Sequence, residues 1–216
     1  MSFDFDIVLR YGPLLLSGLW TTVYICVLAS LLAVAAGLAA ALIYSLPFRA
    51  AKLLCRAYIE VMRGTPILLF IVYYGGPSIG LTLAAETVGI VGLGFYGGGY
   101  FAEIFRAGFQ SIPFGQIEAA RMLGIPRRSI VVRIQIPQML TLIIPPSTNQ
   151  AIILVKESAL LSIITVAELT KNTTQMVNET FAVIEPYVAV ALLYWLIIEG
   201  IALAGGGLER RFSRTS

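Results

Sequence analysis

The segment from Leu14 to Tyr44 contains no charged residue and is almost entirely apolar. A transmembrane helix needs about 20 predominantly apolar residues, so this segment is long enough to cross a bilayer. Only 12% of the 216 residues are charged, whereas ordinary soluble domains carry about 25%. The sequence therefore indicates an integral membrane protein, and it excludes a soluble enzyme, a disordered chain and a nucleic-acid-binding protein.

Apolar stretches of this length recur along the chain, and they cover about residues 14–44, 52–75, 84–108, 137–161 and 186–206. They are too long and too continuous for the strands of a β-barrel. The first is expected to be retained, because Asp4 and Asp6 before it do not suit a signal peptide. We predict an all-α membrane protein with five transmembrane helices. A single transmembrane domain, 14–207, is expected between an N-terminal tail, 1–13, and a C-terminal tail, 208–216.

The basic residues predict the orientation, because lysine and arginine in short loops favour the cytoplasmic side. Ten lie on one side of the predicted spans: Arg49, Lys52, Arg56, Arg121, Arg127, Arg128, Arg133, Arg210, Arg211 and Arg214. Arg10 and Lys171 lie on the other side, and Arg63, Arg106 and Lys156 fall within spans. We therefore expect the N-terminus outside and the C-terminus in the cytoplasm.

Several kinds of chemistry are excluded by what the sequence lacks. It contains no histidine, so neither a histidine metal site nor a histidine general base is available. It also lacks the Gly-rich phosphate loop of ATP-binding proteins. We expect no catalytic residue, no metal site and no cofactor on this chain, so energy for transport would come from a partner or an ion gradient. Cys26 and Cys55 lie in or beside apolar runs and are expected to pack there rather than pair.

Charged residues inside the second predicted span point to a polar site in the membrane, because a charge at bilayer depth needs a partner or a wet cavity. Glu60 and Arg63 are spaced i,i+3 on one helix face. Gly64-Thr65-Pro66 then breaks the helical pattern. One interpretation is a Glu60–Arg63 ion pair that sets helix packing, and the other is a site for a charged or zwitterionic solute. For Glu103 and Arg106, we favour a structural salt bridge.

The fourth predicted span carries a second polar group. Pro145-Pro146 is expected to interrupt the helix, and broken helices near the midplane are where transporters hold polar substrates. The candidate substrate-binding residues are Glu60, Arg63, Thr65, Asn149, Gln150, Glu157 and Ser158. Two acids and one arginine suit a cationic amino acid or an opine better than glutamate. The glycines Gly94 and Gly98 suit close helix packing, within the chain or across a dimer.

The connection at residues 110–136 is predicted to form a helical knuckle on the cytoplasmic side. Residues 117–123 form a short helix in this interpretation. Gly124 suits the C′ position, where a left-handed conformation is favoured. Pro126 suits the first turn of a second short helix, and Pro137 the start of the fourth span.

This knuckle resembles the EAA loop of ABC-transporter permeases. That loop has Glu-Ala-Ala, a glycine after three residues, and later a hydrophobic pair followed by proline. Here Glu118-Ala119-Ala120 precedes Gly124, and Ile136-Pro137 follows, with Gln135 as a departure from the pattern. Other segments are similar to the branch that handles histidine, glutamine, glutamate, arginine, lysine and opines: Glu60–Pro66, Ala102–Arg106, Gln110–Pro113, Thr148–Gln150, Lys156–Ser162 and Val166–Thr170.

The resemblance implies a permease subunit of a type I importer in a bacterial inner membrane. Its partners would be a second permease, identical or homologous, a dimer of cytoplasmic ATPases that binds ATP and magnesium, and a periplasmic solute-binding protein. The ATPase-coupling residues would be Glu118, Ala119, Ala120, Arg121, Gly124 and Pro137. The alternative from the residues alone is an ion-driven secondary transporter, since intramembrane acids would serve that chemistry too.

Overall fold

The computed structural model describes residues 3–64, 71–80 and 82–213, and all regular structure within them is helical. The α-helices are α1 (Phe5–Arg10), α2 (Gly12–Tyr44), α3 (Arg49–Gly64), α5 (Ala85–Gln110), α6 (Phe114–Met122), α7 (Arg127–Ile130), α8 (Ile136–Glu157), α9 (Leu169–Thr180) and α10 (Ile184–Ser213). The π-helical turns η1 (Ile71–Gly75) and η3 (Val131–Gln135) and the 3₁₀ helices η2 (Gly76–Ile79) and η4 (Ser158–Ile164) connect them.

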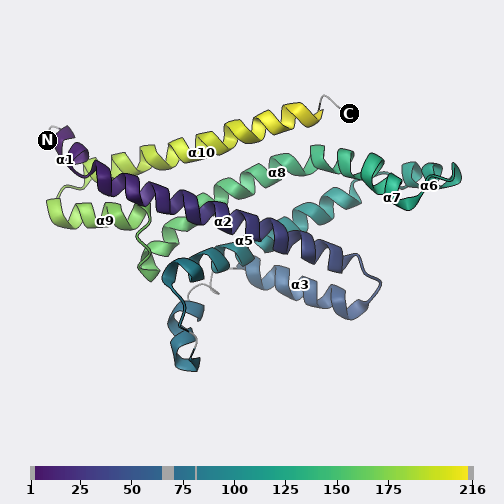
Figure 1. Ribbon diagram of the computed structural model, residues 1–216, viewed down its shortest axis with the longest axis horizontal. Coiled ribbons are helices and arrows are strands. Elements are labelled where there is room, and N and C mark those ends of the chain that lie inside the picture. Colours follow the sequence, from purple (N-terminus) through teal and green to yellow (C-terminus); the bar gives the residue numbers. More distant parts are fainter. Residues whose placement is uncertain (1–2, 65–70, 81, 214–216) are drawn as a thin grey trace.

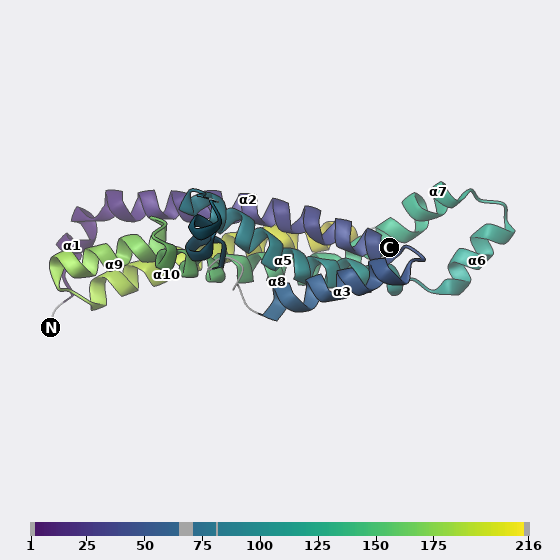
Figure 2. The ribbon, with the colours of Figure 1, turned by 90° about the horizontal axis from the view of Figure 1, so that it is seen from below.

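The long helices form an elongated bundle (Figure 1). The helices α2 and α5 share the most extensive contact, and α8 packs between α5 and α10. Two short helices, α6 and α7, project beyond one end of the bundle, which we call the α6 end (Figure 2). The N-terminus, α1 and α9 lie at the opposite end, which we call the α9 end.

Glycines allow α2 and α5 to approach closely. A Cβ atom at Gly94 would overlap Leu32 of α2, and one at Gly98 would overlap Ala36 and the Tyr58 hydroxyl. The close packing predicted for Gly94 and Gly98 is thus formed within the chain. Both cysteines are buried and free, as expected from their apolar surroundings.

Four helices of the described residues are long and apolar enough to cross a membrane: Gly12–Tyr44, Ala85–Gln110, Arg127–Ser162 and Ile184–Phe212. They match four of the five predicted spans, and the fold class is confirmed as all-α. In the second predicted span, α3 has 16 residues and ends at Gly64. Part of that span, including the candidate residue Thr65, lies outside the described residues.

The prediction that Pro145-Pro146 breaks the fourth span is wrong. Both prolines lie inside α8, which continues from Ile136 to Glu157. Proline removes backbone donors and leaves carbonyl groups of the preceding turn without their helical partners, but neighbouring helices and hydroxyl side chains compensate for this in membrane helices. The irregular geometry lies instead at the two ends of α8, in η3 before it and η4 after it.

Candidate functional site

A line of polar side chains follows one face of α5. Tyr96, Tyr100 and Glu103 are spaced i, i+4 and i+7, so they lie above one another on the helix. The rings of Tyr96 and Tyr100 are 5.2 Å apart between centroids. We call these three residues, together with Arg63 of α3 and Glu157 of α8, the polar seam.

Two charged members of the polar seam, Arg63 of α3 and Glu157 of α8, approach the tyrosines from different helices. The guanidinium of Arg63 lies over the Tyr100 ring, 4.9 Å from its centroid. Glu157 is close enough to act electrostatically on the Tyr96 hydroxyl. A positive and a negative side chain therefore flank one pair of phenols in edge-to-face contact. Gly99 makes this approach possible, because a Cβ there would crowd the Arg63 side chain.

The predicted substrate residues of α8 face in different directions. Asn149 is exposed, whereas Gln150 is buried and its Nε2 has no hydrogen-bond partner among the described residues. Gln150 and the half-buried Glu157 are seven residues apart and share a helix face. Ser158 is fully buried and its hydroxyl donates to the Val155 carbonyl at 2.7 Å. Ser158 is thus satisfied inside the chain, while the other three have polar atoms free to meet a solute.

Glu60 lines a cavity that does not include Glu157. A pocket of about 250 Å³ is lined by Tyr44, Arg56, Ile59, Glu60, Arg63, Glu103 and Arg106. We call it the charged pocket. The structure therefore brings Glu60 and Arg63 together but separates Glu60 from the predicted residues of α8. Arg63 and Glu103 are common to the seam and the charged pocket.

The salt bridge predicted for Glu103 and Arg106 is confirmed. Arg106 donates from Nε to Oε1 at 3.1 Å and from Nη2 to Oε2 at 2.5 Å. Its Nη1 also donates to the side chain of Gln110 at 2.9 Å. By contrast, Glu60 and Arg63 do not form an ion pair within 4.0 Å with each other in the described part of the chain.

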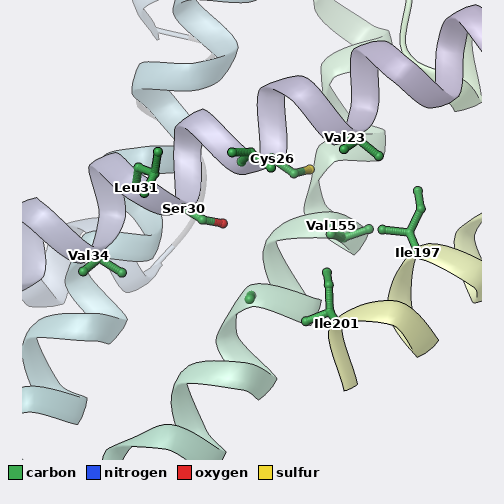
Figure 3. Close-up of a pocket in the computed structure, with 10 residues that line it drawn as sticks. Val23, Cys26, Ser30, Leu31, Val34, Val155, Ile197 and Ile201 are labelled. Carbon is green, nitrogen blue, oxygen red and sulfur yellow. The ribbon is translucent and has the colours of Figure 1, made fainter. Parts of the chain in front are cut away.

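A larger groove on the bundle does not suit a charged solute. It has a volume of about 340 Å³ and lies between α2, α8 and α10. Val23, Leu31 and Val34 line it from α2, and Figure 3 shows Val155, Ile197 and Ile201 facing them. Burying a charged amino acid against such apolar walls would leave its charges without hydrogen bonds. The charged pocket is a cavity with suitable polar groups, and the polar seam offers further charged and polar side chains along α5.

The knuckle at the α6 end has the local structure predicted from its sequence. Its first helix, α6, ends at Met122, and Gly124 follows with a φ of 72°. The N–H of Ile125 donates to the Ala120 carbonyl at 3.1 Å, which closes the helix end. Pro126 precedes α7, and Pro137 lies in the first turn of α8.

The side chains of the knuckle divide into inward and outward sets. Ala120 is only 4% exposed, whereas Glu118, Ala119 and Arg121 are exposed. Ala120 therefore packs within the chain and is not available for direct contact with a partner. Three large apolar side chains point outward beyond the bundle: Phe114, Met122 and Leu123, with exposed fractions of 64%, 91% and 79%. Sequence reasoning missed this apolar surface, although its residues stand next to the recognised motif.

A buried polar cluster joins α9 to its neighbours at the α9 end. Glu168 is fully buried and caps α9 by accepting from the backbone N–H groups of Thr170 and Lys171, at 2.8 and 2.7 Å. Its carboxylate also accepts from Tyr194 of α10 at 3.0 Å. Burial raises the pKa of Glu168, and these hydrogen bonds offset the shift only in part. The sequence showed Glu168 only as one acid in a connection, because its burial depends on α10.

Comparison with known proteins identifies the family. The model of the family described as "Binding-protein-dependent transport system inner membrane component" matches residues 33–214. The chain is 34% identical to the probable glutamine ABC transporter permease protein GlnM of Bacillus subtilis, over 89% of this chain and 92% of that protein. It is 30% identical to the arginine transport system permease protein ArtQ of the same organism, over 98% of both chains.

Solved structures agree with this assignment. The chain matches the crystal structure of an amino acid ABC transporter with histidines at a TM-score of 0.89 and 35% identity, covering 98% of this chain and 100% of the other. It shares its fold with the MetNI methionine ABC transporter, at a TM-score of 0.77 and 22% identity. An ion-driven transporter is thereby excluded. The chain belongs to the family of binding-protein-dependent inner membrane components, as a non-catalytic, multi-pass permease subunit of an ABC importer.

Proposed function

We propose that the chain carries a polar amino acid across the membrane along the polar seam. The observation behind this proposal is the pair of opposite charges around the edge-to-face tyrosines, with Arg63 over the Tyr100 ring and Glu157 within electrostatic range of Tyr96. An α-amino acid carries an ammonium group and a carboxylate. Arg63 would bind the carboxylate through its guanidinium, and Glu157 would bind the ammonium or a cationic side chain.

The substrate class follows from the site together with the relatives. The named relatives are a probable glutamine permease and the permeases of arginine and L-cystine systems. These amino acids differ in side chain but share one head group, so a head-group site is the common requirement. Among them, a cationic amino acid or an opine is favoured, because Glu157 would complement a positive side chain. Asn149 and the unpartnered amide of Gln150 would supply further hydrogen bonds.

The proposed orientation puts the α6 end in the cytoplasm and the α9 end outside. Among the described residues, nine of the basic residues that favour the cytoplasmic side flank the helices toward the α6 end, against Arg10 and Lys171 at the other. The helix α3 would begin the second of five spans within one permease domain, 14–207. The N-terminal tail, 1–13, would then be external and the C-terminal tail, 208–216, cytoplasmic.

The knuckle, 110–136, would couple transport to the ATPase. Three large apolar side chains, Phe114, Met122 and Leu123, are exposed beyond the bundle, where water rather than lipid would surround them. Apolar groups gathered in this way mark a protein contact. Glu118, Ala119 and Arg121 would join that contact at its edge, while Ala120, Gly124 and Pro137 would hold the shape of the knuckle. The complete importer would contain two permeases, two ATPases and an external solute-binding protein.

Co-purification tests the coupling role. A tagged chain is solubilised gently from its native membrane, and the proteins that remain bound are identified. Leu123→Asp would place a charge on the exposed apolar surface and is expected to lose the ATPase, while Asn178→Asp on exposed α9 would retain it. Failure of the wild type to retain any nucleotide-binding protein, or retention by Leu123→Asp, would refute the proposed contact.

A further inference from the structure

The charged pocket lies nearer the α6 end than the Glu157 site does. Two of its residues, Glu103 and Arg106, belong to the last two turns of α5, which ends at Gln110. Tyr44, the final residue of α2, closes another side. The pocket therefore lies toward the end of the bundle from which the knuckle projects.

The charges of the pocket are only partly matched within the chain. Arg56, Glu60 and Arg63 are spaced i, i+4 and i+7 and form one face of α3. Opposite them, Glu103 and Arg106 satisfy each other. Arg56 and Arg63 act electrostatically on Glu103 but make no ion pair within 4.0 Å among the described residues. Glu60 likewise makes no side-chain hydrogen bond or ion pair with the described residues. Charges within a span need a counter-group or a water-filled cavity, and a solute that enters such a cavity can supply the counter-group.

The counter-group must carry both signs, because Arg56 and Arg63 offer guanidinium groups on either side of one carboxylate, Glu60. We propose that the charged pocket is a second binding site for a free α-amino acid. The α-carboxylate would bind Arg56, and the α-ammonium would meet Glu60. Arg63 lies between this pocket and the Glu157 site and would contact the amino acid in one of them at a time. The volume of about 250 Å³ is below the range of about 300–1,000 Å³ typical of drug-sized ligands, which suits an amino acid and not a nucleotide.

The charge balance of this pocket predicts its side-chain preference. Three arginines against two glutamates leave one net positive charge among its lining residues. The pocket would therefore favour amino acids with neutral or acidic side chains and disfavour cationic ones. The Glu157 site has the opposite preference. This inference rests on the proposed transport function, since it assigns the second site to amino acids on the path toward the α6 end.

Binding to the assembled transporter in lipid nanodiscs tests the proposal, with the permease and its ATPase present and no solute-binding protein added. Equilibrium dialysis with labelled L-glutamate, L-glutamine and L-arginine measures each affinity. Arg56→Gln and Glu60→Gln are expected to weaken glutamate and glutamine binding about tenfold and to leave arginine binding at the Glu157 site unchanged. Glu157→Gln should weaken arginine binding about tenfold and leave glutamate and glutamine binding at the charged pocket unchanged. Arg49→Gln, at the exposed start of α3, is the matched control.

Several results would overturn the second site. One is loss of binding of all three amino acids in Glu157→Gln, which would mean a single site. Another is wild-type glutamate affinity in both Arg56→Gln and Glu60→Gln. A third is that these variants separate the two permeases on size-exclusion chromatography without changing amino acid binding, because the charges would then pair between copies. Absence of arginine binding in the wild type would instead refute the Glu157 site, and the glutamate data would still decide the charged pocket.

Discussion

The hydroxyl of Tyr194 in α10 donates a 3.0 Å hydrogen bond to the carboxylate of Glu168, which caps the first turn of α9. Thr170 shares a 3.0 Å hydrogen bond with the same hydroxyl. From the other side, the backbone N–H of Leu169 donates to Thr22 of α2 at 3.1 Å. One short polar cluster therefore ties α2, α9 and α10 together at the α9 end.

Removing the cap is expected to loosen this end of the bundle. Glu168→Ala leaves the Thr170 and Lys171 N–H groups and the Tyr194 hydroxyl without their buried acceptor. A cost of about 1–3 kcal/mol in the free energy of unfolding is expected from the unsatisfied groups. The unfolding midpoint of the detergent-solubilised protein, measured beside that of the exposed Asn178→Ala control, checks this. A midpoint equal to that of the wild type would show that the cluster contributes nothing to stability.

The same carboxyl predicts a pH dependence. Because burial raises the pKa of Glu168 in the folded state, the folded chain binds this proton more tightly than the unfolded chain. The stabilisation from the protonated carboxyl is fully present below the ordinary glutamate pKa of about 4.3 and is lost as the pH rises through the raised pKa. A glutamine at this position does not titrate. The free energy of unfolding of Glu168→Gln, relative to that of the wild type, should therefore increase with pH over that interval. A constant difference in unfolding midpoint between the two proteins would contradict the expectation.

Two adjacent glycines in α10 are expected to respond oppositely to alanine. A Cβ at Gly205 would overlap the Thr148 side chain of α8, whereas one at Gly206 meets no other atom within 4 Å. Gly205→Ala should therefore cost about 1–3 kcal/mol through overpacking, and Gly206→Ala should stabilise the helix by about 0.5–1 kcal/mol. Thermal unfolding of both variants measures the difference. Equal effects would show that α8 and α10 do not pack as closely as in this structure.

Neutralising Glu157 should change substrate preference. Glu157→Gln keeps the size of the side chain but removes the charge that would meet a cationic amino acid. Arginine uptake by reconstituted transporter with its binding protein is expected to fall by about tenfold or more, the value of a charge-assisted hydrogen bond. Glutamine uptake should change less. Glu86→Gln, at the exposed start of α5, is the control, and an unchanged arginine-to-glutamine ratio would argue against a direct role of Glu157.

The two alanines of the knuckle are expected to have separate roles. Ala120 is buried and Ala119 is exposed. Ala120→Asp would bury an unpaired carboxylate and should disrupt the knuckle itself, seen as faster proteolysis of residues 110–136. Ala119→Asp should leave proteolysis unchanged and reduce stimulation of the ATPase by substrate. Identical behaviour of the two variants in both assays would contradict this division.

Local signals in the sequence were sufficient for the knuckle. Gly124 takes the left-handed conformation that ends α6, as predicted, and Pro126 lies at the N-cap of α7, one residue before the first turn predicted for it. The Glu103–Arg106 pair was also predictable, because both partners lie on one helix at i,i+3. Such features involve residues close in the chain, so spacing alone describes them.

The predicted helix break at Pro145-Pro146 was wrong because sequence spacing does not show which helices pack against the segment. Proline disfavours an isolated helix, but α8 packs against both α5 and α10, and these contacts stabilise the helix through the two prolines. The same reasoning explains why Glu60 was grouped with Glu157. Both are intramembrane acids in the sequence, and only the packing of α3 on α5 assigns Glu60 to the charged pocket.

The sequence by itself determined the all-α membrane class, most of the spans, the knuckle and the family, because hydrophobic length, turn residues and motif spacing are properties of short segments. The tertiary structure decided which side chains meet. It put Arg63 on Tyr100, Glu168 under Tyr194 and Ala120 inside the knuckle. Each of these contacts joins residues whose distance depends on how the helices pack. Glycines such as Gly98 and Gly99 control that packing because they let neighbouring helices come within van der Waals contact.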